Sequence, residues 1–144
     1  MAKKYEIIEH TADTGLKVFG KTTGELFQNA ALGMFFLITG CSKITKRGIT
    51  KKNYKMECKA VDLEDLLVSW LNDLLYIHNT EYVILDDFVI NKLTDSFISA
   101  EAKGITIREL NIQINNEIKA VTYHGLKVVR NKNGRWESTL IFDI

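Results

Sequence analysis

The chain has 144 residues, of which 46% are hydrophobic and 26% are charged, and its 19 basic and 18 acidic side chains leave a formal charge of +1 at pH 7. A chain of this length buries roughly 70% of the surface that its unfolded form exposes, so a core can form without disulfides. The near-neutral charge argues against a protein that binds nucleic acid mainly by neutralising phosphates. One basic cluster is interpreted as a solvated loop: Lys43, Lys46, Arg47, Lys51 and Lys52.

Cysteine content and hydropathy favour a cytoplasmic protein over a secreted or membrane-bound one. Only two cysteines occur, Cys41 and Cys58, and no signal peptide precedes the first strand-like segment. The longest apolar run, Ala30–Ile38, is much shorter than the ~20 residues that cross a bilayer. We therefore expect a protein of the reducing cytosol with no membrane span.

Two strands and a helix are predicted in the N-terminal part of the sequence. The strands, Tyr5–Glu9 and Leu16–Gly20, are joined by the small and polar residues of His10–Gly15, which suit a turn. A capping box that begins at Thr22 precedes apolar residues at helical spacing. This first helix is predicted to end at Gly40, because glycine readily adopts the left-handed conformation of a helix C-terminus.

A second helix is predicted after an alternating, β-tolerant segment, Lys43–Glu57. Asp62 can cap this helix, and six apolar residues form a stripe on one side of it: Leu66, Leu67, Trp70, Leu71, Leu74 and Leu75. The opposite side carries polar residues and one tyrosine: Asp65, Ser69, Asn72, Asp73 and Tyr76. The two helices are predicted to share a core against one face of the sheet, formed by Phe27, Ala31, Phe35, Trp70, Leu71 and Leu74.

Strands dominate the rest of the sequence. The candidates are Tyr82–Asp86, Phe88–Leu93, Phe97–Ala102, Glu109–Ile114, Glu117–Tyr123, Leu126–Arg130 and Trp136–Ile144. Asn131–Gly134 predicts a hairpin between the last two, because Asn and Gly accept the positive φ of a tight turn. The order of elements favours an α+β fold, a largely antiparallel β-sheet with two main α-helices packed on it, in a single domain over residues 1–144.

The sequence lacks several signatures of common enzymes. It has no Gly-rich dinucleotide or phosphate loop, no nucleophile elbow and no pair of histidines at metal-ligand spacing. The three histidines, His10, His78 and His124, are far apart and are interpreted as structural or surface residues. Asp13 lies in the first predicted turn, where its carboxylate can close an Asx-turn or present oxygens to a ligand.

The last predicted strand ends in an aspartate beside the terminal carboxylate. Alternation along the strand puts Trp136, Leu140, Phe142 and Ile144 on a face that is expected to be buried, and Asp143 on the other face. Two neighbouring negative groups repel each other unless a cation or a lysine neutralises them. Oxygen ligands of this kind suit Mg²⁺, Ca²⁺ or Mn²⁺ rather than zinc.

Four separated segments, in order, closely resemble archeases: His10–Gly15 with the strand to Gly20, Trp70–Tyr76, Glu117–His124 and Phe142–Ile144. The resemblance extends from about Tyr5 to the last residue. It implies an accessory protein, not itself an enzyme, that activates the GTP-dependent RNA ligase of tRNA splicing. The ligase performs the covalent chemistry, and the archease promotes its guanylylation and multiple turnover with a divalent metal.

The resemblance also implies roles for individual residues. Archeases hold a metal ion through the aspartate of the N-terminal motif and the C-terminal residues, here Asp13, Asp143 and Ile144, the last through main-chain oxygen at a free terminus. Lys119 lies in a matching motif and could contact phosphate, nucleotide or the ligase, or equally face solvent. Asp73 matches an acidic position of the second helix, where the simpler interpretation is solubility.

Two alternatives stay open. The first is a stand-alone metal-dependent phosphoesterase or hydrolase that uses Asp13 and Asp143, although the sequence offers no convincing general base beside them. The second is a chaperone of a tRNA methyltransferase, a role also proposed for archeases, which the sequence does not separate from the ligase interpretation. In each case contact with RNA is expected to be indirect or weak.

Overall fold

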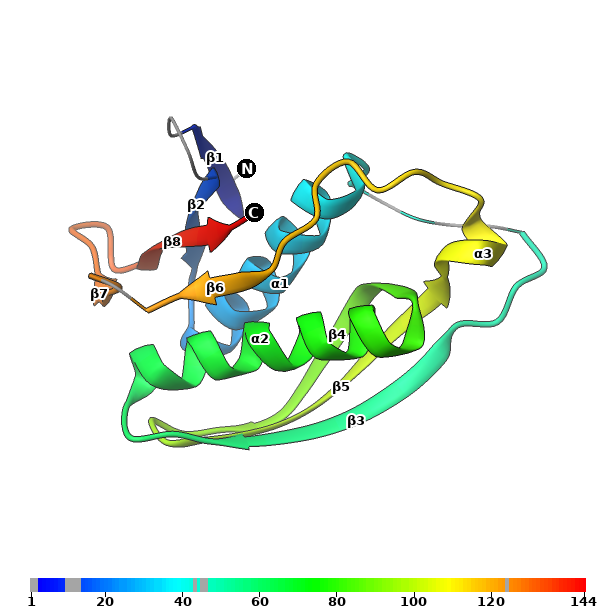
Figure 1. Cartoon of the computed structure of the whole chain (residues 1–144). Coiled ribbons are helices and arrows are strands. Elements are labelled where there is room, and N and C mark those ends of the chain that lie inside the picture. Colours follow the sequence, from blue (N-terminus) through cyan, green and yellow to red (C-terminus); the bar gives the residue numbers. More distant parts are fainter. Residues whose placement is uncertain (1–2, 10–13, 43, 45–46, 124) are drawn as a thin grey trace.

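The computed structural model describes residues 3–9, 14–42, 44, 47–123 and 125–144. Its strands form a five-stranded and a three-stranded antiparallel sheet, and two long helices pack against them (Figure 1). The α+β fold expected from the sequence is confirmed.

Both ends of the sequence contribute to the five-stranded sheet. β1 (Tyr5–Glu9) pairs with β2 (Thr14–Gly20), which pairs with β8 (Trp136–Asp143). The other edge of β8 pairs with two short strands, β6 (Ala120–Thr122) and β7 (Val128–Arg130). The first and last parts of the chain therefore lie side by side (Figure 1).

The predicted hairpin between β7 and β8 is confirmed. Asn131 N donates to Arg135 O at 2.7 Å, and Gly134 N donates to Asn131 O at 3.0 Å. Gly134 has a φ of 76°, a conformation that its missing Cβ permits.

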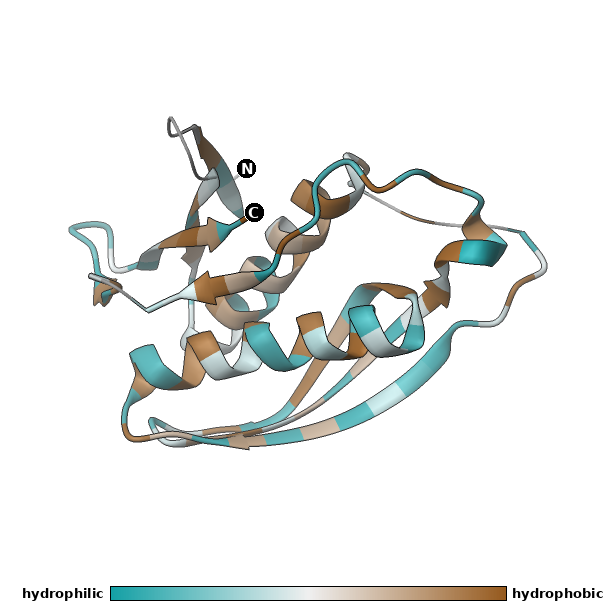
Figure 2. Ribbon diagram, viewed as in Figure 1, coloured by the Kyte–Doolittle hydropathy of each residue, from teal (hydrophilic) through white to brown (hydrophobic). Residues whose placement is uncertain are grey.

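The smaller sheet has the order β3 (Lys52–Lys59), β5 (Phe97–Thr106) and β4 (Val83–Leu93). β4 is one continuous strand, in contrast to the two strands predicted over residues 82–86 and 88–93. A register shift beside Asp86 marks a bulge at that point, and this irregularity breaks the alternation on which the prediction depended. β3 starts later than predicted. It carries hydrophilic residues along much of its length, which is typical of an edge strand (Figure 2).

The two long helices, α1 (Thr23–Thr39) and α2 (Leu63–Glu81), begin at the predicted caps. The side chains of Thr22 and Asp62 accept hydrogen bonds from main-chain N–H groups of the first turns, at 3.1 and 2.8 Å. Gly40 ends α1 with a φ of 74°. Within the described part of the chain, no helix combines the length and apolar character needed to cross a membrane.

The predicted core between the helices is confirmed. Its six members are each 3% exposed or less: Phe27, Ala31, Phe35, Trp70, Leu71 and Leu74. Trp70 Nε1 donates to Phe27 O at 3.0 Å, so the bulkiest side chain of the core also ties α2 to α1 with a hydrogen bond. The smaller sheet completes this core, since α2 packs on β3, β4 and β5 (Figure 1).

The segment between β5 and β6 differs from the prediction. The strand predicted over residues 109–114 is instead the short helix α3 (Ile107–Leu110) followed by irregular chain. Thr106 Oγ1 accepts from Glu109 N at 3.2 Å, and Asn111, with a φ of 53°, ends the helix. Local capping thus overrides the alternating pattern. The strands predicted over 117–123 and 126–130 are correspondingly shortened to β6 and β7.

Candidate functional site

The C-terminal end of β8 lies between the start of β2 and β6. Thr14 pairs with Phe142, and Ala120 pairs with Asp143. Lys119 N donates to Asp143 O at 2.7 Å, which extends the ladder by one residue. The strand that follows the first turn and the strand that ends the sequence are therefore neighbours, as a cation shared by Asp13 and the C-terminal residues would require. The predicted ligand Asp13, which precedes Thr14 in sequence, lies outside the described residues.

Asp143 and Ile144 are both open to solvent. Asp143 occupies the outward-facing position that the alternation predicted, whereas Leu140 and Phe142 are fully buried. Ile144 was expected on the buried face but is 42% exposed, because the ladder ends at Asp143. The exposed Asp143 carboxylate is an oxygen donor of the kind that fits a hard divalent cation.

The described residues contain no cluster of three or more His, Cys, Asp and Glu side chains that could hold a metal ion. The predicted site does not require such a cluster among them. It depends on Asp13, which is outside the described residues, on the Asp143 carboxylate and on main-chain oxygen of Ile144. The predicted metal site therefore stays a prediction.

Lys119 is held next to Asp143. Its main chain is fixed by the hydrogen bond to Asp143 O, while its side chain is exposed. The position agrees with a functional contact near the C-terminal residues, and its ammonium group is available to an anion in solution.

Asp73 has a different environment. It is exposed on α2, and its Oδ2 accepts a hydrogen bond from Cys58 Sγ on β3 at 2.8 Å. Burial, this hydrogen bond and the negative charge of Asp73 together raise the pKa of the Cys58 thiol to about 12. Asp73 therefore helps to fasten α2 to β3, a contact that sequence reasoning did not anticipate.

The neighbouring residue Asn72 faces β6 instead. Its Oδ1 accepts from Val121 N at 3.0 Å, and its Nδ2 is 3.5 Å from Val121 O. The amide thus engages the open edge of β6 as another strand would. Glu64, also on α2, accepts from Val128 N of β7 at 3.0 Å. Sequence reasoning placed Asn72 on the polar face of its helix, but only the fold shows that this face meets a sheet edge.

His78 is a structural residue, as predicted. It is 8% exposed, and its Nδ1 lies 2.8 Å from Val83 O. Burial lowers the pKa of the imidazole, and the hydrogen bond to Val83 O opposes this shift. His10 and His124 lie outside the described residues.

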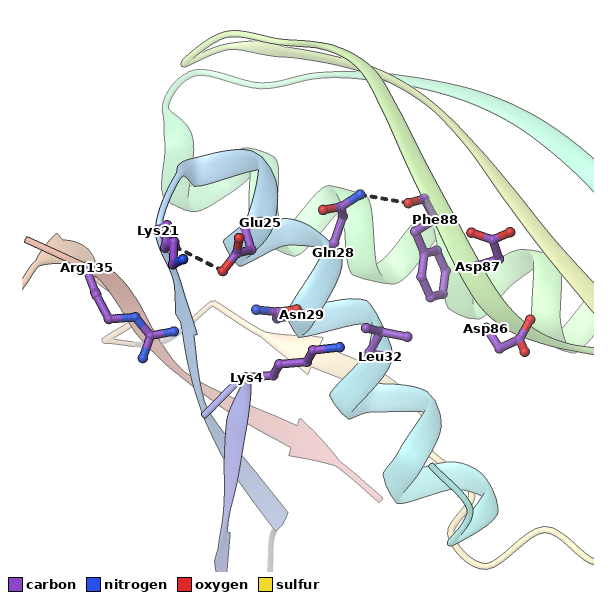
Figure 3. A pocket seen from close by; sticks show the side chains of 10 residues that line it. All are labelled: Lys4, Lys21, Glu25, Gln28, Asn29, Leu32, Asp86, Asp87, Phe88 and Arg135. Carbon is purple, nitrogen blue, oxygen red and sulfur yellow. Dashed lines mark hydrogen bonds between the residues drawn. The ribbon is translucent and has the colours of Figure 1, made fainter. Parts of the chain in front are cut away.

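A cleft of about 460 Å³ beside α1 was not expected from the sequence. Lys4, Lys21 and Arg135 lie toward the larger sheet, and Asp86 and Asp87 lie on β4 (Figure 3). A third carboxylate, that of Glu25 on α1, lies beside Lys21. Lys51 Nζ neutralises Asp86 at 2.8 Å. These opposite charges give the cleft no strong preference for an anion or a cation, and its residues come from separate segments with no shared sequence signal.

Comparison with known proteins decides the family. The profile of the Archease protein family matches residues 5–144. The chain belongs to the archease family. The match covers all four segments on which the resemblance was based.

Several archeases from archaea are similar to this chain over nearly their full length. The archease of Methanosarcina barkeri is 36% identical over 146 residues, which cover 99% of this chain and 97% of the relative. The archease of Pyrococcus furiosus is 35% identical over 145 residues, with 99% of both chains covered.

Two solved structures share the fold. Protein 1598 of Methanobacterium thermoautotrophicum superposes with a TM-score of 0.75 at 29% identity, covering 98% of this chain and 99% of its own. The Thermotoga maritima archease, described as a possible chaperone, superposes with a TM-score of 0.62 over 100% of this chain and 98% of its own. At 22% identity the Thermotoga structure supports the fold alone.

Proposed function

We propose that this archease is an accessory protein that activates the GTP-dependent RNA ligase of tRNA splicing. In this proposal it promotes guanylylation and repeated turnover of the ligase in the cytoplasm and does not catalyse ligation itself. Membership of the archease family supports the proposal, because the matched region covers residues 5–144.

The proposal includes one divalent cation held by Asp13, Asp143 and main-chain oxygen of Ile144. The pairing of Thr14 with Phe142 supports this part, since it brings the described strand that follows Asp13 to the end of β8. The bound cation would supply a concentrated positive charge for phosphate oxygens or for oxygen ligands of the ligase. Asp143 would contribute an anionic ligand, and the hydrogen bond from Lys119 N would hold its backbone in place.

A multiple-turnover ligation assay tests the proposed function. The tRNA-splicing ligase, GTP, divalent metal and excess RNA ends are incubated with and without this protein. We expect many turnovers per ligase and faster accumulation of guanylylated ligase only when the protein is present. An unchanged turnover number would refute the proposal.

A second incubation separates the alternatives. The protein alone, with phosphorylated RNA or nucleotides and Mg²⁺, is expected to release no product, whereas sustained hydrolysis would establish the stand-alone hydrolase. Recovery of a tRNA methyltransferase but not of the ligase in co-purification would favour the chaperone alternative.

A further inference from the structure

A second cavity, of about 490 Å³, lies at the C-terminal end of α2. Its lining residues come from that helix end, from α3 and from the segment that leads from α3 to β6. Ile107, Ile114 and Ile118 give it apolar walls. Its volume lies within the range of pockets that bind small organic ligands, and such pockets combine apolar walls with a few polar groups.

One polar group in the wall is the imidazole of His78. A main-chain carbonyl can only accept a hydrogen bond, so the 2.8 Å contact with Val83 O places the proton on Nδ1. Because burial lowers the pKa of this ring, it is neutral at pH 7, and Nε2 is an acceptor. No described residue donates to Nε2, and Phe35 holds the ring edge-on at a centroid distance of 5.7 Å. A side chain that is 8% exposed thus presents a fixed, unused acceptor.

Two charged residues line the same cavity from the segment that precedes β6. Glu117 and Lys119 are both exposed there, and Lys119 is anchored through its main chain to Asp143. The cavity therefore offers apolar walls, a neutral acceptor on a largely buried ring, a carboxylate and an ammonium group.

We propose that this cavity binds a nucleoside phosphate. The base would lie against the isoleucine walls and donate an N–H to His78 Nε2, a ribose hydroxyl would donate to Glu117, and the phosphate would meet Lys119. Each polar group then receives a partner of the chemistry it requires. An inorganic anion would leave the apolar walls unused and be repelled by Glu117, and a purely apolar ligand would leave His78 Nε2 buried without a donor.

Calorimetry on the full chain, without ligase and with EDTA to remove divalent metals, tests the proposal. The probes are the 5′-monophosphates of guanosine, adenosine and uridine, the three nucleosides themselves, and inorganic phosphate. We expect saturable binding of at least one nucleotide, weaker binding of the matching nucleoside and none of phosphate alone. Absence of binding by all three nucleotides, or phosphate that competes as well as they do, would overturn the proposal.

Two variants assign the binding to this cavity. His78→Asn keeps an N–H donor for Val83 O but removes the acceptor at the position of Nε2, so nucleotide affinity is expected to fall roughly three- to tenfold. Lys119→Gln is expected to reduce nucleotide affinity to that of the nucleoside, and because Lys119 is exposed its replacement preserves the fold. Lys127→Gln, an exposed control on the loop before β7, is expected to bind as the native chain does.

Unchanged nucleotide affinity in Lys119→Gln would contradict the assignment, whether or not His78→Asn folds. The inference goes beyond the proposed function, and its assay contains no ligase. If the protein activates the ligase but binds no nucleotide, only the nucleotide site is disproved. If it binds a nucleotide but does not activate the ligase, only the activator role is disproved.

Discussion

Asp143 combines an exposed side chain with a hydrogen-bonded backbone, which makes it a sharp test of the predicted metal site. Asp143→Asn preserves the size of the side chain but removes its charge, so affinity for Mg²⁺, Ca²⁺ or Mn²⁺ is expected to fall at least tenfold without loss of stability, because a hard cation prefers anionic oxygen. Calorimetry measures the affinity and thermal unfolding the stability. Asp13→Asn is expected to behave in the same way.

Asp95→Asn serves as the matched control, since Asp95 is exposed in the turn between β4 and β5, away from β8. Equal metal affinity in Asp143→Asn and Asp95→Asn would show that the carboxylate of Asp143 is not a ligand.

Cys58 provides a second test at a single side chain. Its thiol donates to Asp73, and a pKa of about 12 keeps it protonated at pH 8, so it is expected to react with iodoacetamide far more slowly than the exposed Cys41. In a Cys41→Ser background, Asp73→Asn removes the negative charge that helps to raise the pKa of Cys58. The alkylation rate, followed by mass spectrometry at pH 8, should therefore increase. A rate that stays the same or decreases would mean that burial alone protects the thiol.

Leu71 tests the packing of α2 on the rest of the core. It is fully buried on the apolar stripe, so Leu71→Ala is expected to lower the free energy of unfolding by about 2–5 kcal/mol through lost burial and a cavity. Urea denaturation measures the loss. Ser69→Ala, a change on the partly exposed side of the same helix, is expected to have little effect. Similar midpoints for both variants would place the stripe outside the core.

Asn72 tests how α2 holds the open edge of the larger sheet. Asn72→Ala leaves Val121 N without its 3.0 Å acceptor, so a cost of about 1–3 kcal/mol and faster hydrogen exchange at Val121 are expected. Asn79→Ala, an exposed change on the same helix, should affect neither quantity. If exchange at Val121 is the same in both variants, α2 does not stabilise β6 through this amide.

The helices were predictable from the sequence because their signals are local. Thr22, Asp62 and Gly40 act within one turn of the chain, and the leucine stripe needs only helical periodicity. The prediction of a strand over residues 109–114 was wrong for a related reason. The caps at Thr106 and Asn111 are also local signals, and they favour a short helix over the strand that the alternating pattern predicted. Contacts such as that between Asn72 and Val121 depend on a sheet edge brought from elsewhere, and no local pattern encodes them.

At the scale of the whole molecule, the metal site stays a prediction, but part of the arrangement around the end of β8 was predictable from the sequence. Outward-facing Asp143 followed from alternation along the last strand, and the meeting of the first turn with that strand was required by a shared cation. The pairing of β2 with β8 satisfies this requirement. The cavity beside His78 was not predictable, because its walls come from α2, α3 and an irregular segment that had been predicted as strands.

If the end of β8 supplies main-chain oxygen to a cation, the free end of the chain is part of the site. Adding Gly-Ser-Gly after Ile144 is therefore expected to weaken divalent-metal binding and ligase stimulation together. The fold should survive, since the ladders of β8 with β2 and β6 end at Phe142 and Asp143. Calorimetry, circular dichroism and the turnover assay measure the three quantities.

The same tripeptide inserted between Lys132 and Asn133 is the matched control. It lengthens the exposed turn at the opposite end of β8, where added residues cost little. Metal affinity and ligase stimulation should then equal those of the native chain. If the C-terminally extended protein still binds metal and stimulates the ligase normally, the terminal oxygen is not part of the site. If the extended protein and the control insertion both lose metal binding and ligase stimulation, the cause is a general effect on β8.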